Sequence, residues 1–65
     1  MKIHAGLATG WYRLHSSDGS EYTIVYLYTN PDTMIRGFGF NIKDGGGFLP
    51  VNDVGKDCWV EPLNL

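Results

Sequence analysis

The amino-acid sequence predicts an all-β protein built from one small antiparallel sheet. Residues 21–29 are almost all β-branched, aromatic or bulky and apolar, a composition that suits a pleated, packed surface. Shorter segments of this kind recur along the chain, separated by turn signals rich in Gly, Pro, Asp and Asn. No window shows the 3.6-residue period of an amphipathic helix long enough to matter.

Chain length predicts a single domain over residues 1–65, close to the lower size limit for a self-sufficient core. A hydrophobic fraction of 43% favours a globular fold over disorder. The single cysteine, Cys58, allows no internal disulfide and favours a reducing compartment. Self-association as a homodimer could therefore supply missing burial. No signal peptide or membrane span is recognisable, so we expect a cytoplasmic protein with no membrane association.

The first predicted strand covers residues 9–15, and Asp18-Gly19 supplies the hairpin turn that follows it. Residues 21–29 form the central strand. Both faces of this strand are largely apolar, which predicts a mid-sheet position with something covering each side. A turn around Asn30-Pro31 then reverses the chain.

The third predicted strand, residues 34–42, is lopsided, with large side chains on one face and Gly37 and Gly39 on the other. Glycine weakens a strand unless another group approaches its backbone closely, and tyrosines of the central strand would be such groups. Residues 48–51 give a short fourth strand at an edge or a bulge, because Pro50 cannot donate to a ladder. Residues 58–61 give the fifth.

Five short strands at this spacing predict an antiparallel meander, curled into a twisted sheet or a small barrel of the SH3-like or OB-like kind. Successive turns of a meander alternate between the two ends of the sheet, and we expect acidic side chains to gather at both. One end would hold Asp18, Glu21 and Asp44, and the other would hold Asp32, Asp53 and Asp57. Either these are simply good turn residues, or they form an acidic rim that faces a basic partner.

Arg36-Gly37-Phe38-Gly39-Phe40 resembles the nucleic-acid-binding signature of RNA-recognition motifs and, more closely, of cold-shock domains. The resemblance implies a single-stranded nucleic-acid binder in which Arg36, Phe38 and Phe40 form a base-stacking platform. The five Lys and Arg residues are scattered, however, so the basic footprint of a nucleic-acid binder is absent. The alternative is that these residues form an aromatic strand, interrupted by glycines, that packs in the core.

Catalytic and metal-binding signatures are missing from the sequence. His4, His15 and Cys58 do not have the spacing of a zinc site, and no nucleophile elbow or phosphate-binding loop is present. We therefore expect a protein without cofactor, metal or enzymatic activity. Trp and Tyr side chains exceed what so small a core can hide, and exposed Tyr and Trp are favoured interface anchors.

The chain as a whole is similar to the small, cysteine-poor all-β proteins encoded by bacteriophages, as its Gly10-Trp11-Tyr12-Arg13 and Asp18-Gly19-Ser20-Glu21-Tyr22 segments illustrate. This resemblance implies an inhibitor of a bacterial defence system, of the anti-CRISPR type, acting in the host cytoplasm. Its acidic turns would mimic DNA phosphates and occlude a basic nucleic-acid-binding surface on a protein partner. The alternatives are the cold-shock-type binder and a structural subunit of a larger assembly.

Overall fold

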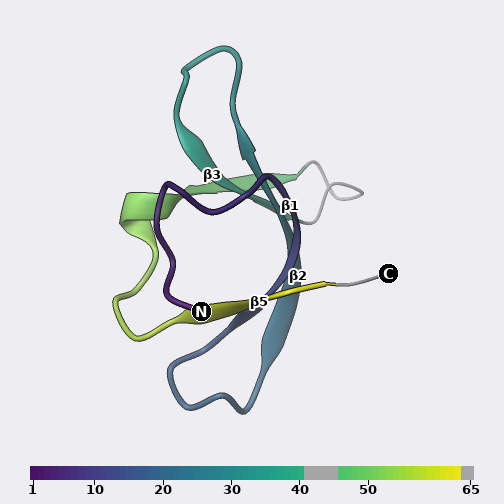
Figure 1. Cartoon of the computed structure of the whole chain (residues 1–65), viewed down its shortest axis with the longest axis vertical. Coiled ribbons are helices and arrows are strands. Elements are labelled where there is room, and N and C mark those ends of the chain that lie inside the picture. The colour runs from purple at the N-terminus through teal and green to yellow at the C-terminus, as the bar shows by residue number, and fades with distance from the viewer. Residues whose placement is uncertain (41–45, 64–65) are drawn as a thin grey trace.

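The computed structural model describes residues 1–40 and 46–63 and contains five β-strands in one antiparallel sheet (Figure 1). The described elements are β1 (Gly10–His15), β2 (Tyr22–Thr29), β3 (Arg36–Phe40), β4 (Gly47–Pro50), the short 3-10 turn η2 (Val51–Asp53) and β5 (Trp59–Pro62). The predicted all-β class and the number of strands are confirmed. No helix in the described residues is long and apolar enough to cross a membrane.

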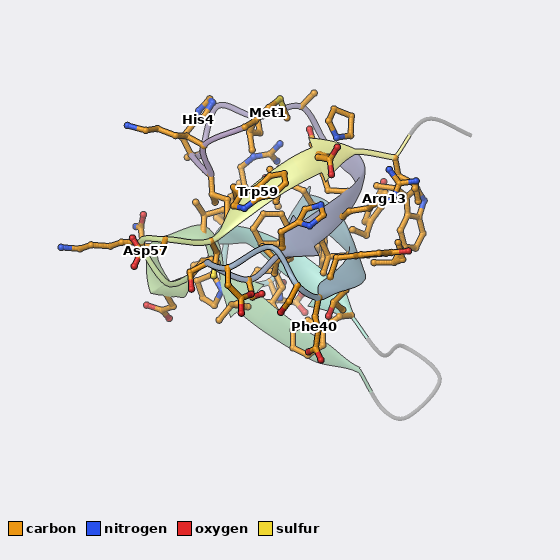
Figure 2. The ribbon with its side chains drawn as sticks, turned by 90° about the horizontal axis from the view of Figure 1, so that it is seen from below. Met1, His4, Arg13, Phe40, Asp57 and Trp59 are labelled. Carbon is orange, nitrogen blue, oxygen red and sulfur yellow. The ribbon has the colours of Figure 1, made fainter. Side chains whose placement is uncertain are left out.

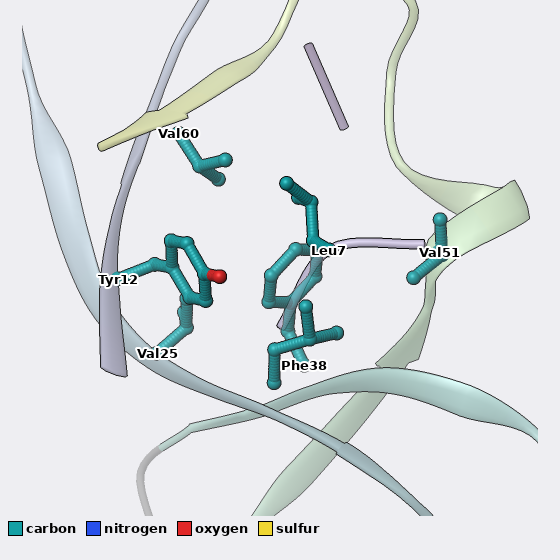
Figure 3. Packing of buried hydrophobic residues seen from close by; sticks show 7 residues of the cluster. Leu7, Tyr12, Val25, Phe38, Val51 and Val60 are labelled. Atoms are coloured by element: carbon teal, nitrogen blue, oxygen red, sulfur yellow. The ribbon is translucent and has the colours of Figure 1, made fainter. Parts of the chain in front are cut away.

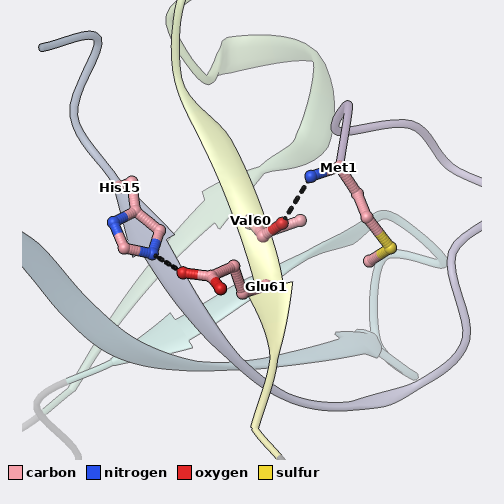
Figure 4. Close-up of polar contacts among 4 residues, drawn as sticks. All are labelled: Met1, His15, Val60 and Glu61. Carbon is pink, nitrogen blue, oxygen red and sulfur yellow. Dashed lines mark hydrogen bonds and ion pairs between the residues drawn. The ribbon is translucent and has the colours of Figure 1, made fainter. Parts of the chain in front are cut away.

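Strand order in the sheet is β4-β3-β2-β1-β5, so the first four strands form a meander and the fifth does not continue it. Beyond β4, the chain passes through η2 and returns to pair β5 with the free edge of β1. Figure 1 shows the strands curling around a common centre as a result. The other edge of β5 receives the N-terminus. The Met1 amino group donates a hydrogen bond of 2.7 Å to the Val60 carbonyl (Figure 4), and the Val60 amide donates one of 3.0 Å to the Met1 carbonyl.

The central position predicted for residues 21–29 is confirmed, but only one face of β2 is fully covered. Val25 and Leu27 point inward and are 1% and 0% exposed. On the outer face, Tyr22 and Ile24 remain 58% and 41% exposed. The described residues form one layer around a core, and none of their elements makes a second layer over the outer side.

The core lies inside the curled sheet and is built from the N-terminal segment, β1, β2, β3, η2 and β5 (Figure 3). Its buried members are Leu7, Tyr12, Val25, Leu27, Phe38, Val51 and Val60. Leu7 comes from the segment before β1, and a hydrogen bond of 2.7 Å from the Tyr12 hydroxyl to the Ala8 carbonyl holds that segment over the barrel. The burial of these side chains supplies the main driving force for folding.

Glycines in β3 allow aromatic rings to lie against the outer face of its backbone. A Cβ added at Gly39 would come within 3.0 Å of the Tyr28 ring, and one at Gly37 would meet the Leu49 carbonyl at 2.6 Å and the Phe48 ring at 2.7 Å. The expected tyrosine cover is confirmed at Gly39, whereas at Gly37 the covering ring comes from β4. Pro50 ends β4 at the edge of the sheet, as predicted.

Candidate functional site

Phe38, the centre of the sequence-predicted nucleic-acid platform, is a core residue. Its side chain is 0% exposed and Phe40 packs against the same cluster. The Arg36 guanidinium donates hydrogen bonds to the Thr29 hydroxyl, at 3.1 Å, and to the Leu7 carbonyl. A base cannot stack on Phe38, because its ring has no accessible surface, and this burial argues against the predicted platform at its central residue. Packing explains the glycine-punctuated aromatic strand instead.

Asp18 stabilises the β1–β2 turn with its own side chain. One carboxylate oxygen accepts hydrogen bonds from the Ser20 backbone amide (3.0 Å), the Ser16 hydroxyl (2.8 Å) and the Ser20 hydroxyl (2.8 Å). These donors, with the Ser20 amide first, lower the pKa of Asp18 from 3.8 to about 2. The carboxylate is thus charged and exposed, while its hydrogen bonds show the local turn function that Asp often has.

The other predicted acidic residues lie on exposed loops at both ends of the sheet. Glu21 precedes β2 beside the Asp18 turn, and Asp32 and Asp53 lie at the opposite end, where β3 begins and β4 ends. Asp57 was expected with that second pair, but this is wrong. It leads into Trp59, which pairs with His15 at the Asp18 end, because β5 runs back along β1 (Figure 2). Asp44 lies outside the described residues.

No described Lys or Arg nitrogen lies within 4.0 Å of a carboxylate in these loops. The exposed acidic residues are Asp18, Glu21, Asp32, Asp53 and Asp57. Their charges are therefore available to a partner, although they are divided between two ends of the molecule rather than gathered on one surface.

The β2–β3 connection, residues 30–35, forms a tip that extends away from the sheet (Figure 1, teal). It carries two neighbouring exposed apolar side chains, Met34 at 75% and Ile35 at 46% exposure, beside the exposed carboxylate of Asp32. Sequence reasoning assigned Met34 and Ile35 to the third strand. They belong to the turn instead, because β3 begins only at Arg36.

Met34 adopts a left-handed backbone conformation, with φ at 59°, and is the one non-glycine residue in the described chain with positive φ. Hydrogen bonds fix this geometry. The Met34 amide donates to the Asn30 carbonyl at 2.7 Å, and the Asn30 amide donates to the Ile35 carbonyl at 2.9 Å. A residue in this conformation costs roughly 1–2 kcal/mol when it is not glycine. The turn therefore directs a large apolar side chain into solvent against a local preference for Gly or Asn.

Aromatic side chains form a chain of contacts across the outer face of the sheet. Trp11 contacts Tyr26 with ring centroids 5.1 Å apart, Tyr26 contacts Tyr28 at 5.9 Å, and Tyr28 meets Phe48 edge-on at 5.4 Å. The rings bridge β1, β2 and β4 over the glycines of β3. Trp11 keeps 44% of its surface exposed. Strand alternation in the sequence groups these side chains on one face of the sheet. It does not say whether that face points outward or towards the core.

A second aromatic group closes the junction between β1 and β5. The His15 ring is 8% exposed, stacks on Trp59 with centroids 3.9 Å apart and also contacts Tyr22 at 5.6 Å. His15 Nε2 lies 2.6 Å from Glu61 Oε1, although the contact is not aligned as a hydrogen bond, and Nδ1 has no partner among described residues (Figure 4). These side-chain contacts hold β5 against β1.

Several surface depressions are lined by the described residues, and one of about 250 Å³ has His15, Glu21 and Cys58 in its lining. Another of about 300 Å³ is lined by Ile3, Val51, Val54 and Cys58 together with two lysines. No group of three or more potential metal ligands is found within residues 1–40 and 46–63. The expectation that the chain is not an enzyme stays a prediction.

Comparisons of the chain with protein-family models, with curated proteins and with solved structures found no match.

Proposed function

We propose that this chain is a non-enzymatic module that binds a protein partner through the tip of its β2–β3 hairpin. The observation that carries the proposal is the conformation of Met34, whose 75% exposed side chain is held at φ 59°. Backbone strain in folded proteins concentrates at binding and switch sites. A turn selected only for folding would place Gly or Asn at this position.

Chemistry at the tip favours a partner with an apolar pocket flanked by basic side chains. Met34 and Ile35 would fill the pocket, because large apolar groups that become desolvated provide most of the energy at the centre of an interface. Asp32 beside them would meet Arg or Lys at the rim. The remaining loop carboxylates would speed the encounter with a basic surface more than they would strengthen the complex.

A nucleic-acid-binding surface on a bacterial protein fits this description. The resemblance to phage-encoded inhibitors of defence systems extends the proposal in the same direction, with the host cytoplasm as the place of action. The inhibitor would occupy the surface that normally binds DNA or RNA. Burial of Phe38 argues against the cold-shock-type alternative, because a base cannot stack on a ring that has no accessible surface.

The test is capture of a partner from a bacterial lysate with the tagged chain, followed by rebinding of the purified partner. We expect the double variant Met34→Ala with Ile35→Ser to weaken rebinding at least tenfold. The matched control, Ile24→Ser, removes an exposed apolar side chain of the outer face and should leave rebinding unchanged. Binding should also weaken as the NaCl concentration rises, because the rim charges are exposed.

Two results would contradict the proposal. One is rebinding that the double variant leaves intact. The other is binding of labelled single-stranded DNA or RNA at micromolar concentration or tighter, since that would make the nucleic acid itself the ligand.

A further inference from the structure

We infer that a second surface, on the outer face of the sheet, is the interface of a twofold-symmetric homodimer. This outer patch consists of Trp11, Arg13, Tyr22, Ile24 and Glu61. It lies on β1, β2 and β5 and does not include the hairpin tip. The inference is therefore independent of the proposed function, and a dimer would carry two free tips.

The outer patch holds three exposed apolar side chains, which lie on the neighbouring strands β1 and β2. Trp11 is 44% exposed, Tyr22 58% and Ile24 41%. Backbone pairing places Ile24 directly opposite Arg13. Tyr22 is two residues before Ile24 on β2, and Trp11 is two residues before Arg13 on β1. A contiguous apolar surface of this kind, with charged groups beside it, is typical of a protein interface.

Charges in the outer patch are complementary to a second copy of the same surface. Arg13 and Glu61 are directly paired across β1 and β5, yet the Glu61 carboxylate contacts His15 and Arg13 forms no ion pair with a described residue. The Arg13 guanidinium lies 5.9 Å from the centre of the Tyr22 ring and points away from the barrel (Figure 2). In a twofold-symmetric dimer each Arg13 would meet the Glu61 of the other copy. Because the symmetry repeats every contact, the interface would hold two such ion pairs.

The area of the outer patch sets the strength to expect. An entire aromatic side chain has roughly 150–250 Å² of surface, so the exposed parts of the five side chains come to roughly 400 Å². Two copies would bury roughly 800 Å², which is the range of weak and transient interfaces. The dimer should therefore be reversible, with a dissociation constant in the micromolar range or weaker. Such burial would help a short chain that has no disulfide.

Molar mass as a function of concentration tests this inference on the full chain. Light scattering or sedimentation equilibrium between about 10 μM and 1 mM should show the mass rise from 7.3 kDa towards twice that value. Ile24→Lys should weaken dimerisation at least tenfold. The matched control Met34→Lys, at the exposed tip, should leave it unchanged. Circular dichroism confirms that each variant is folded.

A charge-reversal pair tests the twofold geometry itself. Arg13→Glu alone and Glu61→Lys alone should each stay monomeric at a concentration where the unmodified chain is dimeric. An equimolar mixture of the two should form a heterodimer, because every contact across the axis then joins opposite charges. The inference is overturned if the unmodified chain is monomeric at 1 mM or if Ile24→Lys has no effect. It is also overturned if the folded reversed variants fail to pair with each other.

Discussion

The imidazole ring of His15 stacks on the indole ring of Trp59, with centroids 3.9 Å apart and planes 6° from parallel. This contact joins β1 to β5, the strand that leaves the meander and closes the sheet on the opposite edge. The same two residues are directly paired in the backbone register. Attachment of β5 to the edge of the sheet therefore depends on one aromatic stack as well as on main-chain hydrogen bonds.

Loss of the stacked indole should destabilise the fold. Trp59→Ala removes the cover of His15 and most of the outer contact between the two strands, and we expect the free energy of unfolding to fall by about 2–4 kcal/mol. Urea denaturation followed by circular dichroism measures this change. Trp11→Ala is the matched control, and because Trp11 is 44% exposed its loss should be smaller. Equal losses for the two tryptophans would contradict this view of strand closure.

Alanine substitutions at the β3 glycines should separate two kinds of close approach. At Gly37 an added methyl group would meet the Leu49 carbonyl at 2.6 Å and Pro50 Cα at 2.9 Å, and backbone atoms cannot easily move aside. At Gly39 its nearest neighbour is the Tyr28 ring at 3.0 Å, which can shift. We expect Gly37→Ala to cost about 2–3 kcal/mol and Gly39→Ala less than about 1 kcal/mol. Thermal unfolding that ranks them in reverse order would contradict the packing described.

Relief of the left-handed conformation at Met34 should stabilise the protein. Met34→Asn keeps the turn and suits positive φ, so the free energy of unfolding should rise by about 1 kcal/mol. Under the proposed function the same variant should bind the partner less well, because the apolar anchor is gone. Chemical denaturation and rebinding measure the two effects separately. A less stable Met34→Asn would show that the backbone is not strained.

Acid should remove the stabilisation that Asp18 provides. Its pKa is lowered from 3.8 to about 2 in the folded chain, so the native state favours the charged carboxylate. This contribution is complete above pH 3.8 and is lost as the pH falls towards 2. Asp18→Asn should therefore be less stable than the unmodified chain at pH 7, and the difference should shrink between pH 4 and 2. A difference independent of pH would mean that the Ser16 and Ser20 hydrogen bonds do not act through the charge.

The sequence predicted the elements of this fold better than their arrangement. The β-branched and aromatic composition of residues 21–29 and the turn signals around them were sufficient to find the strands, because both are local properties. The pairing of β5 with β1 was not predictable in this way. It depends on contacts such as the His15–Trp59 stack, between residues more than forty positions apart.

The candidate sites show the same division. Strand alternation separated Arg36, Phe38 and Phe40 from the glycines between them, but could not say which set faced the core. The family-like signature suggested the exposed choice and the structure has the buried one. Nothing in the sequence marks Met34 as left-handed, because that conformation is imposed by the hydrogen bonds between Asn30 and residues 34–35.

The most direct test of the central claim is photo-crosslinking from the hairpin tip to the captured partner. A photoreactive side chain is introduced at Met34 in one preparation and at Ile24, on the outer patch, in another. Both positions are exposed, so both groups can react with any protein that reaches them. We predict a covalent adduct with the partner from position 34 and none from position 24. Adducts from position 24 alone would contradict the assignment of the tip as the binding site.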